Sequence, residues 1–155
     1  MRMQTLLLVD DELENLRCLG EILNRFGYNV IAKPDAHSAI SVVRGGTHVD
    51  LVITDYRMPG MDGLEFSMLL KQMLPAVPVI MLTAYGAVET YLKSLSLGIF
   101  EYVNKPVKAK ELGRIVKSAL ACPENDSSAL SSRPARESPS LKMQAEANRQ
   151  DDPHS

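Results

Sequence analysis

Five short apolar runs alternate with helix-like segments along most of the chain, and this alternation restricts the fold more than any other feature. The runs are β-branched or aromatic in part, and most lack the polar alternation of a half-exposed sheet, which is typical of buried parallel strands. We expect strands at Leu6–Val9, Val30–Ala32, Leu51–Ile53, Val79–Leu82 and Phe100–Val103.

The segments between and after these runs carry apolar residues at positions i, i+3, i+4 and i+7, a spacing that predicts helices with one buried face. The apolar positions are Leu16, Leu19, Leu23 and Phe26; Ala36, Ala39, Ile40 and Val43; Phe66, Leu69, Leu70 and Met73; Val88, Tyr91, Leu92 and Leu95; and Leu112, Ile115, Val116 and Ala119.

Boundary residues agree with these helices. Asp35 is placed to cap the second helix, and Pro75 to close the third. Gly27 and Gly98 are placed to end the first and the fourth. Strict alternation of strands and helices predicts an α/β fold, a doubly wound (βα)5 domain whose parallel sheet is covered by helices on both faces, because right-handed crossovers are nearly obligatory.

The composition changes at about Cys122. Residues 122–155 are rich in serine and proline and contain few large apolar residues, so they are too polar to bury a core. We therefore expect a folded domain at residues 1–121 and a disordered polar tail at 122–155. Residues 1–121 carry 13 basic and 13 acidic side chains, and the tail carries 4 and 6. Neither part has the basic stripe of a nucleic-acid-binding surface, so direct nucleic-acid binding is not expected.

Membrane and export signals are absent from the sequence. No apolar run approaches the roughly 20 residues of a membrane-spanning helix, and the short apolar stretch after Arg2 leads directly into acidic residues, unlike a secretory signal. Cys18 and Cys122 fit no metal-binding spacing and are expected as free thiols in a reducing compartment. A soluble protein located in the cytoplasm is expected.

Polar residues follow four of the predicted strands. Asp10 and Asp11 follow the first strand, Asp55 the third, Thr83 the fourth and Lys105 the fifth. Ligands of open parallel sheets bind beyond the carboxyl ends of the strands. We therefore expect these side chains to meet at one edge of the sheet.

Three carboxylates at one edge repel one another unless their pKa values rise or a cation neutralises them. Oxygen donors favour a hard divalent ion, and a few carboxylates with a carbonyl and waters suit Mg²⁺ better than Ca²⁺. Zn²⁺ is disfavoured because no His or Cys lies at the strand ends. With the metal, Asp55 could attack phosphorus to form an acyl phosphate while Lys105 and Thr83 balance the charge.

Four stretches of the sequence resemble the receiver domains of two-component response regulators in identity, order and spacing. The likeness covers residues 4–121, and it implies a flavodoxin-like fold with the strand order 2-1-3-4-5. The stretches are Leu8-Val9-Asp10-Asp11-Glu12, Asp55-Tyr56-Arg57-Met58-Pro59-Gly60-Met61-Asp62-Gly63, Leu82-Thr83-Ala84 and Lys105-Pro106.

The resemblance implies a role for each matching residue around the metal. Asp55 is expected to be the phosphoacceptor and a metal ligand, Asp11 a direct ligand and Asp10 a ligand through water. The backbone carbonyl of Arg57 is expected as a further ligand. Mg²⁺ is the implied ion, and Mn²⁺ is expected to be able to replace it.

The resemblance also implies which residues bind the phosphoryl group and which residue changes position in response to it. The Thr83 hydroxyl and the Ala84 backbone amide would donate hydrogen bonds to it, and Lys105, before an expected cis bond to Pro106, would pair with it. Tyr102 matches the family's aromatic switch position, which moves when the threonine is drawn inward.

The partners that the resemblance implies are proteins. A sensor histidine kinase, a phosphotransfer protein or a small phosphodonor would supply the phosphoryl group in a phosphorelay. The surface formed by the helix around residues 88–95, the strand 100–103 and the helix around residues 112–119 would then contact a downstream target. A phosphorylation-linked homodimer through that surface is a further expectation. The domain would catalyse only its own phosphoryl transfer and dephosphorylation, and is not expected to be an enzyme.

Three other functions fit parts of the pattern. Haloacid-dehalogenase-like phosphatases also use an aspartyl phosphate and Mg²⁺, but their nucleophile ends the first strand in an Asp-x-Asp pattern and a cap insertion follows. An interaction module without phosphorylation is opposed by the intact set of acidic residues, Thr83 and Lys105. A flavin-binding protein would need a small, donor-rich loop after the first strand, where this chain is acidic.

Overall fold

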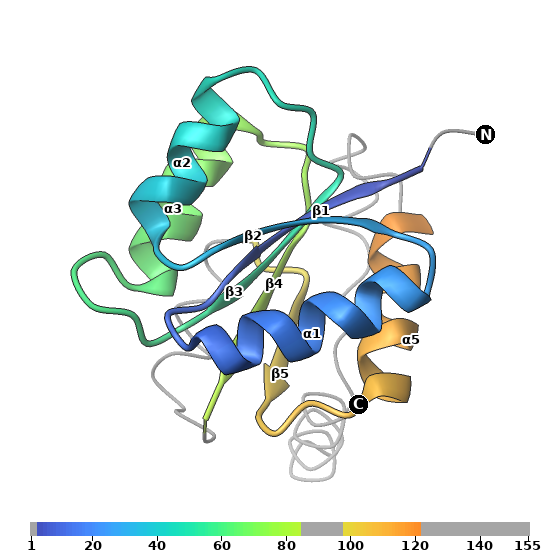
Figure 1. The fold of residues 1–155 in the computed structure, drawn as a ribbon. Coiled ribbons are helices and arrows are strands. Elements are labelled where there is room, and N and C mark those ends of the chain that lie inside the picture. The colour runs from blue at the N-terminus through green and yellow to red at the C-terminus, as the bar shows by residue number, and fades with distance from the viewer. Residues whose placement is uncertain (1–2, 85–97, 122–155) are drawn as a thin grey trace, which may run out of the picture. The chain divides into compact units, whose positions relative to one another are not determined.

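A computed structural model describes residues 3–84 and 98–121. Within these residues five parallel strands form one sheet in the order β2-β1-β3-β4-β5 (Figure 1). The predicted doubly wound fold and its strand order are therefore confirmed. The strands are β1 (Thr5–Val9), β2 (Asn29–Lys33), β3 (Leu51–Asp55), β4 (Val79–Thr83) and β5 (Glu101–Asn104).

Helices cover both faces of the sheet: α1 and α5 lie on one face, and α2 and α3 on the other (Figure 1). The helix predicted from Val88, Tyr91, Leu92 and Leu95 lies outside the described residues, and so does the predicted tail at 122–155. All described residues belong to the first of the two units into which the chain divides, Met1–Asn125. The described helices are α1 (Leu13–Arg25), α2 (Ala36–Arg44), α3 (Gly63–Met73) and α5 (Ala109–Ala121).

The core has two halves because successive residues of a strand point to opposite faces. In β1, Leu6 and Leu8 pack with residues of α1 and α5, whereas Leu7 and Val9 pack with residues of α2 and α3. Every residue of β3 and of β4 is buried, and the edge strands β2 and β5 are only partly buried. The continuous apolar runs of the sequence thus mark the central strands.

Phe26 differs from the prediction that it continues the buried face of the first helix. It follows the last residue of α1 and is 48% exposed. Its ring lies on Gly113 of α5, where an added Cβ would come within 2.8 Å of the ring carbon Cε2. The turn at Gly27, with a φ of 97°, ends the helix as predicted. The ring therefore links α1 to α5 from outside the helix.

Two further sequence expectations concern the fifth strand and the cysteines. β5 begins at Glu101, one residue later than predicted, although the Phe100 backbone N still donates a hydrogen bond to the Val79 carbonyl at 2.9 Å. Cys18 is an exposed free thiol on α1. None of the described helices combines the length and the apolar character needed to cross a membrane.

Asp35 caps α2 as the sequence predicts. Its carboxylate accepts a hydrogen bond from the Ser38 backbone N at 2.7 Å, which satisfies a donor of the first helical turn. This hydrogen bond holds the pKa of Asp35 below its ordinary value. The ionised carboxylate therefore stabilises the folded state.

We expect Asp35→Ala to lower the free energy of unfolding at neutral pH by about 1 kcal/mol, and Asp35→Asn to lower it much less, because asparagine caps about as well as aspartate. A depressed folded pKa gives stability that is present above the unfolded pKa and is lost as the pH falls through the folded pKa. The loss in the free energy of unfolding caused by Asp35→Ala should therefore become smaller as the pH falls. Urea unfolding at several pH values measures it, and an alanine variant as stable as the parent at neutral pH would contradict the assignment.

Candidate functional site

The polar residues predicted to meet do lie at one edge of the sheet, the edge formed by the carboxyl ends of the strands. Asp10 directly follows β1, and its backbone N donates a hydrogen bond to the Lys33 carbonyl of β2 at 3.2 Å. Asp55 and Thr83 are the last residues of β3 and β4. Lys105 directly follows β5. The parallel register thus brings chain positions far apart in sequence to one place.

Three carboxylates form a cluster at this edge. Asp10, Asp11 and Asp55 each offer an oxygen, and these oxygens lie within 4.8 Å of one another. Asp10 is fully buried and Asp55 is 5% exposed, whereas Asp11 is exposed. Among the described residues this is the one group of three or more acidic, His or Cys side chains close enough to share a metal ion. The cluster is thus buried on one side and open to solvent at Asp11.

Lys105 supplies the opposite charge. Its Nζ lies 3.0 Å from Asp55 Oδ1 and 3.4 Å from Asp10 Oδ2. The Lys105 backbone N donates a hydrogen bond to the Thr83 carbonyl at 2.7 Å, and the peptide bond to Pro106 is cis, as the resemblance implies. Burial alone would lower the pKa of Lys105, but the hydrogen bond to Asp55 and the charges of Asp10 and Asp55 outweigh it and raise the pKa. The ammonium is therefore held in its charged form.

One ammonium does not neutralise the cluster. Burial raises the pKa of Asp55, and the charges of Asp10 and Asp11 raise it further, whereas the hydrogen bond and the charge of Lys105 lower it. The net pKa of Asp55 is raised. The folded protein therefore carries excess negative charge at a site of low exposure, which favours a bound cation.

The donor set fits a hard divalent ion. Carboxylate oxygens that are already close together are the ligands that Mg²⁺ and similar ions take, and an open side at Asp11 leaves room for water or phosphate oxygens. The soft or nitrogen donors of a typical Zn²⁺ site are missing from this cluster, since each of its members is an aspartate. The residues present thus fit the implied metal.

The loop after β3 is anchored against the phosphoacceptor candidate. Gly63 begins α3, and its backbone N donates a hydrogen bond to the Tyr56 carbonyl at 2.7 Å. A Cβ on Gly63 would clash with the Asp55 carbonyl oxygen and lie 2.9 Å from Met81 Sδ. Asp62 and Glu65 complete a capping box at the start of the helix. Only glycine fits here without displacing the backbone of Asp55.

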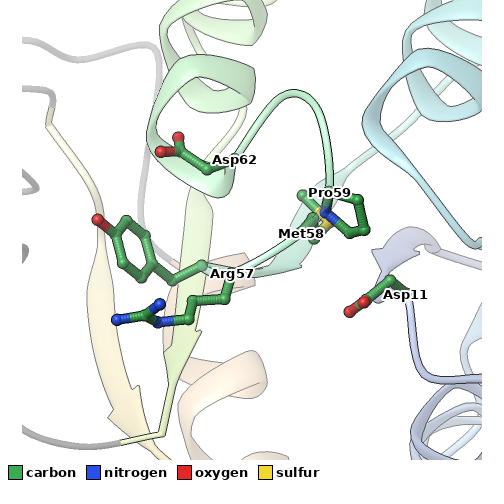
Figure 2. Close-up of a pocket in the computed structure, with 6 residues that line it drawn as sticks. Asp11, Arg57, Met58, Pro59 and Asp62 are labelled. Carbon is green, nitrogen blue, oxygen red and sulfur yellow. The ribbon is translucent and has the colours of Figure 1, made fainter.

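The same loop borders an open pocket beside the cluster. Figure 2 shows Asp11 across the pocket from Pro59, and the Arg57 side chain directed away from Asp11. The Arg57 guanidinium is therefore not directed at Asp11, the member of the cluster that lines this pocket. The pocket is lined by Asp11, Tyr56, Arg57, Met58, Pro59 and Asp62.

Thr83 and Tyr102 lie on the same face of the sheet. Thr83 pairs with Asn104 in the β4–β5 register, and Tyr102 is two residues before Asn104, so their side chains share a face. Thr83 is 3% exposed and Tyr102 is partly buried. Ala84 is exposed directly after β4. Thr83, which is expected to bind the phosphoryl group, and Tyr102, which is expected to respond to it, thus lie on neighbouring strands and on the same face.

Sequence reasoning missed two residues that contact the cluster. Asn15, in the first turn of α1, lies with its Nδ2 3.4 Å from Asp10 Oδ2 and 2.6 Å from Glu12 Oε1. The Glu12 backbone N also donates a hydrogen bond to Asp10 Oδ1 at 2.9 Å. The position of Asn15 could have indicated this contact. Asn15 lies one helical turn beyond the acidic pair, where a side chain can reach back toward the start of the helix.

Comparison with known proteins assigns the chain to a family. The family model for the response regulator receiver domain matches residues 6–117. The transcriptional regulatory protein ZraR of Salmonella typhimurium is 35% identical over 116 residues, which are 75% of this chain and 26% of ZraR. The probable transcriptional regulator ycf27 of Cyanophora paradoxa is 37% identical over 120 residues, 77% of this chain and 49% of that protein.

Solved structures agree. A response regulator receiver domain protein (CheY-like) from Methanospirillum hungatei superposes with a TM-score of 0.76 at 27% identity, and covers 80% of this chain and 98% of that one. The chain thus belongs to the receiver domain family of response regulators. It spans about a quarter of ZraR and about half of ycf27.

We expect Asp55→Asn to raise the melting temperature by a few degrees at neutral pH without divalent cations. A raised folded pKa means that stability is lost as the pH rises through it, because the buried carboxylate must then ionise. The melting temperatures of the two proteins should converge in acid, where Asp55 is protonated. Mg²⁺ should raise the melting temperature of the parent more than that of the variant. Thermal unfolding with chelator and with Mg²⁺ measures this. A variant less stable than the parent in chelator would contradict the charge argument, and Asp35→Asn is the matched control.

Proposed function

We propose that this receiver domain accepts a phosphoryl group on Asp55. The observation that carries the proposal is the Asp55 carboxylate itself, which lies 3.0 Å from the Lys105 ammonium inside a cluster of three aspartates at the edge of the sheet. A carboxylate nucleophile, an ammonium and a metal-binding set of oxygens are together the parts that phosphoryl transfer needs. Membership of the receiver family supports the same role.

In the proposed reaction an Asp55 carboxylate oxygen attacks the phosphorus of the donor. The new bond from oxygen to phosphorus forms as the bond to the leaving group breaks, and the leaving group departs with the bonding electrons. Lys105 stays near the developing charge, and the Thr83 hydroxyl and the Ala84 amide donate hydrogen bonds to the phosphoryl oxygens. Water later attacks the phosphorus of the acyl phosphate, and the bond from phosphorus to the Asp55 oxygen breaks, which releases inorganic phosphate and regenerates the carboxylate. This self-catalysed cycle makes the domain a phosphoacceptor and not an enzyme acting on other substrates.

The residues proposed to hold Mg²⁺ are Asp10, Asp11, Asp55 and the backbone carbonyl of Arg57. When bound, the ion supplies positive charge that offsets the repulsion between the carboxylate and the phosphoryl oxygens. Mn²⁺ prefers the same oxygen donors and is proposed to substitute. The burial of Asp10 and Asp55 supports this, because a buried pair of carboxylates with one ammonium retains excess negative charge.

Phosphorylation is proposed to change the surface formed by the segment at residues 88–95, by β5 and by α5. Thr83 is drawn toward the phosphoryl group, and the ring of Tyr102 moves into the space that it leaves. The shared face of these two residues in the β4–β5 register supports such coupling. The first of the three segments lies outside the described residues.

The proposed partners follow from this chemistry. A histidine kinase or a phosphotransfer protein supplies the phosphoryl group, and a protein target reads the altered surface, with a homodimer as a further form of output. We assign the receiver domain to residues 1–121 and the polar tail to 122–155, and propose a cytoplasmic location without direct contact to nucleic acid or membrane. ZraR and ycf27 are described as transcriptional regulators, so in a longer chain a separate segment would contact DNA.

We expect the intact protein to gain one phosphoryl group when incubated with acetyl phosphate and Mg²⁺, as measured by mass spectrometry. Asp55→Asn should gain none, because the amide is not a nucleophile, and a chelator should prevent the gain in the parent. Asp35→Asn, which changes the same charge outside the cluster, should behave as the parent does. Thr83→Ala should keep the gain, because its hydroxyl is not the acceptor.

Two results would contradict the proposal. A phosphoryl group retained by Asp55→Asn at a distant position would mean that the acceptor lies elsewhere. No gain in the parent with any phosphodonor and metal would favour an interaction module that works without phosphorylation.

A further inference from the structure

Asn15 is a polar side chain of α1 that reaches the acidic cluster without belonging to it. Its Nδ2 lies 3.4 Å from Asp10 Oδ2 and 2.6 Å from Glu12 Oε1. Both partners are carboxylates, which accept hydrogen bonds and cannot donate them when ionised. The amide nitrogen, which carries two hydrogens, therefore faces both carboxylates.

Glu12 holds this amide instead of capping the helix. It occupies the N-cap position of α1, yet its side chain makes no capping hydrogen bond. Its Oε1 instead accepts the shorter of the two hydrogen bonds from Asn15. This short hydrogen bond restrains the amide, whose nitrogen also lies 3.4 Å from Asp10 Oδ2. Helix capping therefore does not account for the arrangement.

Few hydrogen-bond donors contact the Asp10 carboxylate. It is fully buried, and a buried carboxylate needs hydrogen bonds to each oxygen. Oδ1 accepts from the Glu12 backbone N at 2.9 Å, and Oδ2 lies 3.4 Å both from Lys105 Nζ and from Asn15 Nδ2. In the proposed reaction Lys105 stays near the charge of the phosphoryl group. Of the two side chains at Oδ2, Asn15 is therefore the one that contacts Asp10 without also serving the phosphoryl group.

We propose that Asn15 is a positioning residue for the metal site, which acts by holding the Asp10 carboxylate in place from outside the ligand set. The inference rests on the proposed function, since it concerns the metal that the site is proposed to bind. Partners outside the ligand set typically contribute about 10- to 100-fold to metal affinity. The Asn15–Asp10 contact is long, so we expect the lower end of that range.

The test is direct binding of Mn²⁺, followed by the electron paramagnetic resonance signal of the free ion. Asn15→Ala should weaken Mn²⁺ binding by about 10-fold. Arg17→Ala is the matched control, because Arg17 lies on the same helix in an exposed pair with Glu14 at 3.1 Å, outside the cluster. Its Mn²⁺ affinity should equal that of the parent. Circular dichroism establishes that each variant is folded.

A second readout separates positioning from a merely structural role. The Mg²⁺ concentration that gives half the maximal rate of phosphoryl uptake from acetyl phosphate should rise about 10-fold in Asn15→Ala. The rate at saturating Mg²⁺ should stay within about twofold of the parent, because Asn15 touches neither Asp55 nor the phosphoryl group.

The outcomes are distinct. Equal Mn²⁺ affinities for Asn15→Ala and the parent would overturn the inference, and so would equal losses in Asn15→Ala and Arg17→Ala. A lower saturating rate with an unchanged Mg²⁺ requirement would also overturn it. If the parent protein itself failed to bind Mn²⁺, the proposed metal site would be wrong, and the inference about Asn15 would fail with it. This failure is distinguishable because it is seen in the parent, before any variant is compared.

Discussion

The ammonium of Lys105 between two buried carboxylates is the interaction on which the site depends. It lies 3.0 Å from Asp55 and 3.4 Å from Asp10, both of which have almost no exposure to solvent. A buried charge is tolerated only when it is paired and hydrogen-bonded. One ammonium against two buried carboxylates and the nearby Asp11 leaves the site short of positive charge. Burial raises the pKa of Asp55, and the charges of Asp10 and Asp11 raise it further against the opposing effect of Lys105. The proposed metal binding and the expected response to phosphorylation rest on this shortage of positive charge.

The fold makes this unfavourable arrangement tolerable. The two central strands β3 and β4 are buried along their whole length, so apolar burial stabilises the scaffold independently of the charged edge. The close packing of Gly63 on the backbone of Asp55 and Tyr56 then fixes the position of the Asp55 backbone, from which the proposed acceptor side chain extends. The unfavourable electrostatic repulsion is thus confined to one edge of a sheet whose central strands are stabilised by apolar burial.

Much of this architecture could be read from the sequence, because the signals were periodic or local. Apolar runs predicted the strands, and the rule for strand ends brought Asp10, Asp55 and Lys105 together. The exposure of Phe26 could not be predicted, since it depends on a contact with Gly113 in a helix far along the chain. The role proposed for Asn15 was hidden for a related reason. Asparagine in a first helical turn is ordinary, and only the orientation of its amide distinguishes it.

The aspartate cluster is proposed to be a divalent-cation site built around the Asp55 carboxylate. Anomalous diffraction from crystals of the protein grown with Mn²⁺ tests this most directly, because it locates the ion without reference to activity. We predict one strong anomalous peak within coordination distance of carboxylate oxygens of Asp11 and Asp55. A strong peak elsewhere, or none at the cluster with Mn²⁺ in excess, would contradict the account.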